Sequence, residues 1–128
     1  MCRLMVFAGH VGNHVISLIR NFIESVRYDP YLSNILPGRS SHDNGWGITL
    51  VNEDSIQYYK TSKPLFVDPA LTNIIEIIKQ LDYAVILIHG RASSREPVNY
   101  INSHPIIWPC ADGSYMILAH NGSVNKSI

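Results

Sequence analysis

Apolar residues recur at the spacing of an amphipathic helix in two segments, and helices with one apolar face must bury that face against another layer. The first segment covers residues 14–27 and is expected to stop near Asp29-Pro30. The second begins after Pro69, whose fixed backbone angle suits the first turn of a helix, and extends to Leu81. We expect this second helix to pack on the face of a sheet.

Strand patterns account for the other regular segments. Residues 3–8 predict a strand, and residues 48–51 and 56–59 are joined by four polar residues, which is typical of an antiparallel β-hairpin. Residues 83–88 (YAVILI) and 115–118 (YMIL) are near-continuous apolar runs. Such runs predict strands that are covered on both faces.

Polar phrases that contain glycine lie beside these strands. Residues 30–45 are rich in proline, glycine and serine and lead into the phrase HDNGWGI. The phrase HGRASS follows residues 83–88, and AHNGSV follows residues 115–118. Loops held by a rigid sheet commonly carry function, so these phrases are the candidates for a site.

The bulk properties are those of one small globular domain, which we assign to residues 1–128. Lysine and arginine together number ten, as do aspartate and glutamate, so no basic field favours nucleic acid as a partner. No apolar run approaches the roughly 20 residues that span a bilayer, and none fits a signal peptide. We therefore expect a cytoplasmic location without a membrane partner. Cys2 and Cys110 lack the spacing of a metal site or a disulfide scaffold.

Cys2 directly follows the initiator methionine, at the start of a predicted strand. Removal of Met1 gives this cysteine a free α-amino group, whose unperturbed pKa is about 7.7–8.0. Part of that amine is neutral at physiological pH and can act as a general base on the thiol of its own residue. By position alone, however, an early cysteine is more often a small buried strand residue.

Two loop phrases offer groups for binding or for charge stabilisation. Arg91 can hold a carboxylate in a bidentate pair, or it can be an exposed arginine near Glu96. Asn121 and Gly122 can direct a side-chain amide and a backbone N–H at one developing oxyanion, or they can form an ordinary Asn-Gly turn. The residues alone leave both alternatives open.

The six histidines do not form a convincing metal site, and we expect none. His10 and His14 lie four residues apart at a predicted helix start, but no carboxylate completes a ligand set. Trp46 and Trp108 can contact a ligand, although tryptophan most often fills a core.

Taken together and in order, the phrases MCRL, HDNGWGI, HGRASS, NSHPI and LAHNGSV resemble the class II glutamine amidotransferases. These are N-terminal nucleophile hydrolases that release ammonia from glutamine. The resemblance covers residues 2 to about 125 and is closest to the small stand-alone members of the family. It implies an α+β fold, an αββα sandwich with antiparallel sheets. It also implies a glutaminase-type amide hydrolase that takes glutamine and needs no cofactor or metal.

The resemblance further implies a role for each matching residue. Cys2 would attack the side-chain amide of glutamine, with its α-amino group as general base, and form a thioester that water hydrolyses. Arg91 would pair with the α-carboxylate of glutamine, and Ser94 would help to orient the same end. Asn121 and Gly122 would stabilise the oxyanion of the tetrahedral intermediate. By the same resemblance, the pocket wall would include Asp43, Gly45, Trp46 and Gly47.

Length is the main departure from the family. Family domains are usually longer, and an aspartate that holds the α-ammonium of glutamine normally lies past the Asn-Gly pair, beyond Ile128. We therefore expect the N-terminal portion of the domain, with an incomplete sandwich. A coding fragment, a split protein completed by a second chain or homo-oligomer, and a shortened homologue without turnover all fit. The alternative functions are a non-catalytic glutamine-binding or assembly module and an N-terminal nucleophile hydrolase for another amide.

Overall fold

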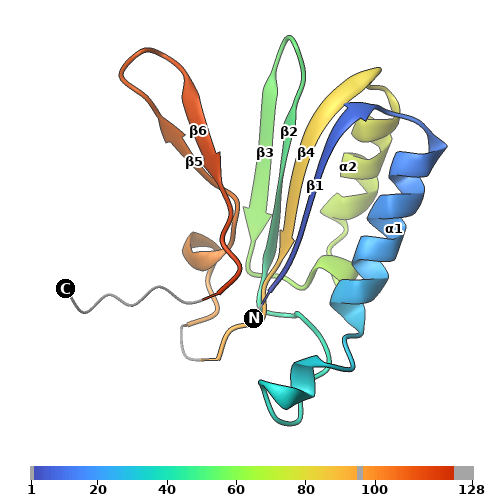
Figure 1. Cartoon of the computed structure of the whole chain (residues 1–128), viewed down its shortest axis with the longest axis vertical. Coiled ribbons are helices and arrows are strands. Elements are labelled where there is room, and N and C mark those ends of the chain that lie inside the picture. Colours follow the sequence, from blue (N-terminus) through green and yellow to red (C-terminus); the bar gives the residue numbers. More distant parts are fainter. Residues whose placement is uncertain (1, 95–96, 123–128) are drawn as a thin grey trace.

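The computed structural model describes residues 2–94 and 97–122, which form a four-stranded sheet, two α-helices and a separate two-stranded hairpin (Figure 1). Within these residues the strands are β1 (Arg3–His10), β2 (Trp46–Val51), β3 (Ile56–Thr61), β4 (Tyr83–Gly90), β5 (Ile106–Pro109) and β6 (Tyr115–Leu118). The helices are α1 (Asn13–Arg27) and α2 (Ala70–Lys79), and short 3₁₀ helices form η1 (Leu32–Asn34), η2 (Leu65–Val67) and η3 (Tyr100–Asn102). Every predicted helix and strand is present, with bounds shifted by a few residues.

The larger sheet has the strand order β1-β4-β2-β3, and each pair of neighbours is antiparallel. β4 lies between β1 and β2 and pairs with β1 along its whole length. β5 and β6 form the second antiparallel sheet. The predicted α+β fold with antiparallel sheets is therefore confirmed.

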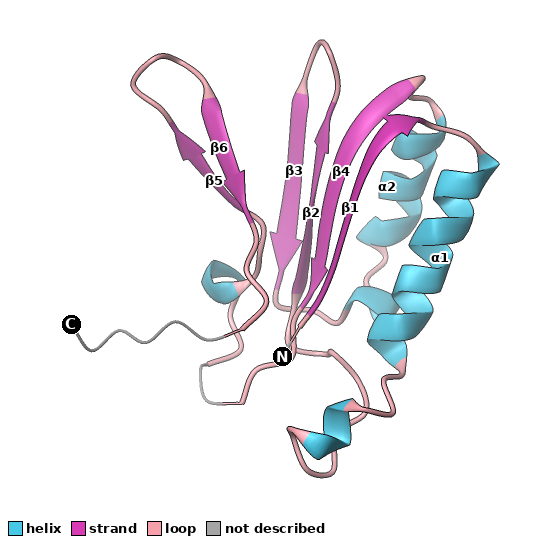
Figure 2. Ribbon diagram, viewed as in Figure 1, coloured by secondary structure: helices cyan, strands magenta, loops and turns pink. Residues whose placement is uncertain are grey.

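Both α-helices cover the same face of the larger sheet (Figure 2). The core between these layers joins the inward side of α1 to alternate residues of β2 and β4. Full burial of an aliphatic side chain in such a core stabilises the fold by about 1.5–3 kcal/mol. α1 ends at Arg27, and Tyr28 is already extended, so the helix stops just before Asp29-Pro30 as predicted. The buried residues of α1 are Val15, Ile16, Ile19, Phe22, Ile23 and Val26.

On the opposite face of the sheet, several apolar side chains are exposed in the described part of the chain. Val85 of β4 is 37% exposed, and Val6 of the neighbouring β1 is 63% exposed. In the hairpin, Tyr115 and Met116 are also exposed. The prediction that residues 83–88 and 115–118 are covered on both faces is therefore wrong for these residues. A run of apolar side chains does not reveal whether a second layer covers the outward ones.

Of the helices in residues 2–94 and 97–122, none has the length and apolar character required to cross a membrane.

Candidate active site

The site is organised by the end of the central strand β4. The antiparallel register pairs Arg3 with Gly90 and Trp46 with Gly90, on the two sides of the strand. One residue further, Cys2 precedes β1 and Arg91 follows β4, so both lie at the same end of the sheet. Strand pairing alone thus brings residues from distant parts of the sequence together.

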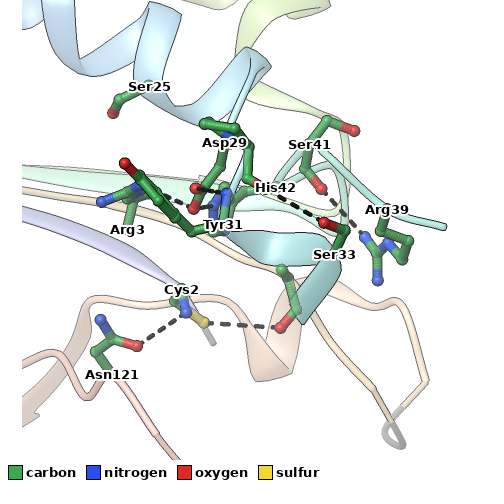
Figure 3. A network of polar contacts seen from close by, with 12 residues as sticks. Cys2, Arg3, Ser25, Asp29, Tyr31, Ser33, Arg39, Ser41, His42 and Asn121 are labelled. Atoms are coloured by element: carbon green, nitrogen blue, oxygen red, sulfur yellow. Dashed lines mark hydrogen bonds and ion pairs between the residues drawn. The ribbon is translucent and has the colours of Figure 1, made fainter. Parts of the chain in front are cut away.

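Cys2 is half-buried and contacts the loop that follows β6. Its nitrogen lies 2.8 Å from Oδ1 of Asn121, across 119 residues of sequence (Figure 3). Its Sγ atom lies 4.0 Å from the carbonyl oxygen of Ala92. Because Oδ1 of Asn121 accepts from Cys2, the Nδ2 donors lie at the other end of the same planar amide. The side chain can therefore contact the nitrogen of Cys2 and still present N–H groups to a third group.

Arg91 is 5% exposed, which excludes the alternative of an exposed surface arginine. Its Nη1 atom donates to the carbonyl oxygens of Asn44, at 3.4 Å, and Pro97, at 3.2 Å. Glu96, the partner considered for an exposed arginine, lies outside the described residues. The guanidinium is thus fixed by backbone carbonyls from two segments.

The loop before β2 is hydrogen-bonded to the loop after β4. The N–H of Asn44 donates to the carbonyl of Arg91 at 3.0 Å, and the N–H of Arg91 donates to the carbonyl of Gly45 at 2.9 Å. Oδ1 of Asn44 accepts from the N–H of Ser93 at 2.8 Å. Asn44 of the DNGWG phrase thus ties the two loops together.

Asp43 and the two glycines of this phrase are also constrained. Asp43 forms an ion pair with Arg39, whose Nη1 atom donates to the carbonyl of Ser93 at 2.8 Å. Gly45 has φ +114°, and a Cβ there would lie 2.7 Å from a backbone oxygen of β3. A Cβ at Gly47 would lie 2.9 Å from Cβ of Lys60. Both positions require glycine because β3 and the segment at Ser103 and His104 approach so closely.

The remaining predicted residues lie in different surroundings. Trp46 is fully buried in the core and donates its indole N–H to Asp68 at 3.0 Å, so its place in a pocket wall stays a prediction. Ser94 and Gly122 are exposed. Met1, whose removal the predicted chemistry needs, lies outside the described residues.

A polar cluster beside Cys2, in which Asp29 and His42 are buried and Arg3 is partly exposed, was missed at the sequence level. Nη2 of Arg3 lies 2.8 Å from Oδ2 of Asp29, and Nε2 of His42 lies 2.9 Å from the same oxygen. Burial raises the pKa of Asp29, but the hydrogen bond from His42, a backbone N–H and the charge of Arg3 together hold that pKa below its usual value. Burial lowers the pKa of His42 despite the nearby carboxylate. One feature of the sequence could have indicated this cluster. Arg3 is a charged residue in a strand whose residues two and four positions further on, Met5 and Phe7, face the core.

Three histidines lie around the loop that carries Asn121. Nδ1 of His104 lies 3.2 Å from the carbonyl oxygen of His120 and 3.3 Å from its nitrogen. The rings of His89 and His104 are 4.8 Å apart. Burial lowers the pKa of His89 to about 3, so this ring is neutral near pH 7. Among the described residues, no group of three or more histidine, cysteine or acidic side chains is arranged to hold a metal ion.

A pocket of about 250 Å³ lies elsewhere, between α2 and the β2–β3 hairpin. Its lining is mainly apolar and contains none of the predicted site residues. The lining residues are Ile48, Leu50, Gln57, Tyr58, Tyr59, Ala70, Asn73, Ile74 and Ile77.

The antiparallel α+β frame, with a cysteine near the N-terminus beside an asparagine amide, is compatible with the N-terminal nucleophile hydrolase class. The family model described as class II glutamine amidotransferases matches residues 33–128, and the chain therefore belongs to that family. The matched range includes Arg91 and Asn121 but begins after Cys2. A search of curated proteins and a search of solved structures give no significant match. Family membership supports a glutamine amidotransferase-like function with glutamine as substrate.

Proposed function

We propose that the chain carries out the glutaminase half-reaction, in which the side-chain amide of glutamine is hydrolysed to glutamate and ammonia. The observation that carries this proposal is the 2.8 Å contact between the nitrogen of Cys2 and Oδ1 of Asn121. Acyl transfer needs a nucleophile beside a preorganised hydrogen-bond donor, and in this proposal Sγ of Cys2 and Nδ2 of Asn121 take those two roles. We assign residues 1–128 to one amidotransferase domain on this basis.

The proposed reaction begins once Met1 has been removed. The α-amino group of Cys2 takes the thiol proton, directly or through water, and Sγ attacks the amide carbon of glutamine. The oxyanion of the tetrahedral intermediate accepts from Nδ2 of Asn121 and the N–H of Gly122. The intermediate collapses as the ammonium form of the amine protonates the departing nitrogen, which leaves as ammonia. Water then loses a proton to the amine, attacks the thioester and releases glutamate and the thiol.

Substrate binding in this proposal uses the end of β4. Arg91 pairs with the α-carboxylate of glutamine, because a planar guanidinium matches that group in geometry and charge. Ser94 orients the same end, and residues 43–47 wall the pocket. The support for this arrangement is that the loops carrying Asn44 and Arg91 are hydrogen-bonded to each other. Because these hydrogen bonds already hold the two loops together, the loops do not need to rearrange when glutamine binds.

The test measures glutamate and ammonia released from glutamine by protein whose Met1 is shown to be absent by mass spectrometry. Cys2→Ala abolishes release, whereas Cys110→Ala, which removes the other cysteine, retains it. Asn121→Ala lowers kcat by roughly 100- to 1,000-fold, as loss of one oxyanion donor does in other enzymes. No release above the Cys2→Ala background contradicts the proposal.

Two other outcomes identify the alternative functions. Glutamine binding measured by calorimetry, without turnover, indicates a binding or assembly module that keeps the fold. Turnover that is unchanged in Arg91→Ala indicates an N-terminal nucleophile hydrolase for an amide without the α-carboxylate of glutamine.

A further inference from the structure

Asp29 is a buried carboxylate that the proposed reaction does not use. It is 6% exposed, and its Oδ2 atom accepts from Nη2 of Arg3 at 2.8 Å and from Nε2 of His42 at 2.9 Å. Its Oδ1 atom accepts from the N–H of Tyr31 at 3.0 Å. An ionised carboxylate can only accept, so Nε2 of His42 carries the hydrogen in this contact. Asp29 therefore joins the start of β1, the end of α1 and the loop before β2 at one point.

Arg3 links this point to Cys2. Successive side chains of a strand point to opposite faces, and Arg3 shares its face with Met5 and Phe7, which pack against the core. Arg3 therefore reaches the helix side of the sheet, while the preceding residue, Cys2, meets Asn121 (Figure 3). The ion pair with Asp29 holds the backbone from the helix side and leaves Cys2 turned away from the core.

His42 links the same point to the loop that fixes Arg91. The N–H of His42 donates to the carbonyl of Val26 at 2.8 Å, so the loop is attached to α1 through its backbone and to Asp29, just past the helix, through its ring. Two residues later, Asn44 is hydrogen-bonded to the backbone of Arg91. Asp29 is therefore connected to the backbone of Arg91 through His42 and Asn44, which lie two residues apart in one loop.

We propose that Asp29 is a positioning residue, which acts through Arg3 and His42 to fix the nucleophile relative to the substrate-binding loops. The inference rests on the proposed function, because it assigns Asp29 a role in that same site. Placement of a reacting group is worth large factors in rate, and a displacement of about 1 Å can cost roughly 100-fold.

The first experiment measures kcat and KM for glutamine in the processed full chain. Asp29→Asn keeps the size of the side chain but removes its charge, and we expect kcat to fall by roughly 10- to 100-fold. Arg3→Gln has the same effect, whereas Arg3→Lys, which keeps a cation, retains most of the rate. Glu24→Gln is the matched control, because Glu24 forms an exposed ion pair with Arg27 on α1 and leaves kcat unchanged.

A double-mutant cycle separates positioning from general loss of stability. If Asp29 acts through Arg3, the kcat of Asp29→Asn combined with Arg3→Gln equals that of the worse single variant. Folded fractions measured by circular dichroism are used to correct kcat for unfolded protein. Multiplicative losses in the cycle, or equal rates for Arg3→Gln and Arg3→Lys, overturn the proposal. If Asp29→Asn does not fold, the comparison of the two Arg3 variants decides the question.

A second measurement does not depend on glutaminase activity. The rate of Cys2 alkylation by iodoacetamide reports the surroundings of the thiol, and Cys110 in the same molecule is the internal control. We expect Asp29→Asn and Arg3→Gln to change the Cys2 rate several-fold and to leave the Cys110 rate unchanged. Unchanged Cys2 reactivity overturns the inference about Asp29. Absence of glutamine turnover in the wild type, with the alkylation effect present, contradicts the proposed function alone.

Discussion

Acidification should destabilise the protein chiefly through one buried histidine, His89. The side chain is 0% exposed, at the end of β4, and its ring lies 4.8 Å from that of His104. Burial lowers its pKa from 6.5 to about 3, and the charge of a protonated His104 acts in the same direction. The folded state therefore holds His89 neutral over a range in which the unfolded chain takes up a proton.

The size of the effect follows from linkage between protonation and folding. The unfolded state binds more protons below pH 6.5, so the stability contributed by neutral His89 is complete above that pH and falls as the pH decreases. A difference of about 3.5 pKa units corresponds to roughly 5 kcal/mol once the pH has fallen to the folded value. At about pH 4.5 the loss is roughly 3 kcal/mol. Asp29 and Asp68 contribute little above about pH 4.5, because their stabilisation is lost only as the pH falls below the unfolded pKa of 3.8 towards their lowered folded values.

The assay is urea unfolding followed by circular dichroism, at about pH 7.5 and about pH 4.5, for wild type and His89→Gln. His42 and His104 also have lowered pKa values, so both proteins lose stability in acid. The variant should lose about 3 kcal/mol less than the wild type between the two pH values, because glutamine does not titrate. Equal losses in the two proteins would refute the reasoning.

Two further predictions concern the stability of the fold, one through packing at Gly90 and one through the hydrogen bonds of Asp68. A Cβ at Gly90 would lie 2.7 Å from Cγ2 of Val26, so Gly90→Ala should lower the free energy of unfolding by about 1–3 kcal/mol, and Val26→Ala in the same chain should recover part of it. An unchanged urea midpoint for Gly90→Ala contradicts the overlap. Asp68 accepts from Trp46 at 3.0 Å and from the hydroxyl of Tyr59 at 2.7 Å, so Asp68→Ala leaves two donors without their acceptor and should cost about 3 kcal/mol, measured by urea unfolding. A loss below about 1 kcal/mol contradicts the importance of these bonds.

The fold could be predicted from the sequence where a single periodicity decides the structure. The apolar positions of α1, such as Val15, Ile19 and Val26, recur at helical spacing, and this spacing is a local property of the chain. The bounds of β4 were harder to predict from the sequence. His89 and Gly90 continue the strand because they pair with Leu4 and Arg3, and pairing depends on a distant segment.

The candidate site could be predicted from the sequence only in part, because it too depends on contacts between distant segments. Cys2, Arg91 and Asn121 were selected by their chemistry and by resemblance, but neither source gives their distances. The pairing of Arg3 with Asp29 depends on which face of the sheet Arg3 occupies and on where α1 ends, and these depend on register and packing. For Trp46 the sequence did not reveal the surroundings of the side chain, because the DNGWG phrase continues directly into the buried strand β2.

The register between β1 and β4 determines where the residues of the candidate site lie along the sheet. Cys2 and Arg91 each lie one residue outside the ladder, on strands that pair residue by residue from Arg3–Gly90 onward. A slip of two residues would preserve the inward and outward pattern yet shift Cys2 along the sheet by roughly 7 Å, out of reach of its partners. Deleting two residues within β1 is thus far more damaging than lengthening the turn that joins β1 to α1. Natural insertions and deletions should accordingly accumulate at the far end of the sheet. They should spare the strand residues that set the register from Arg3–Gly90 onward.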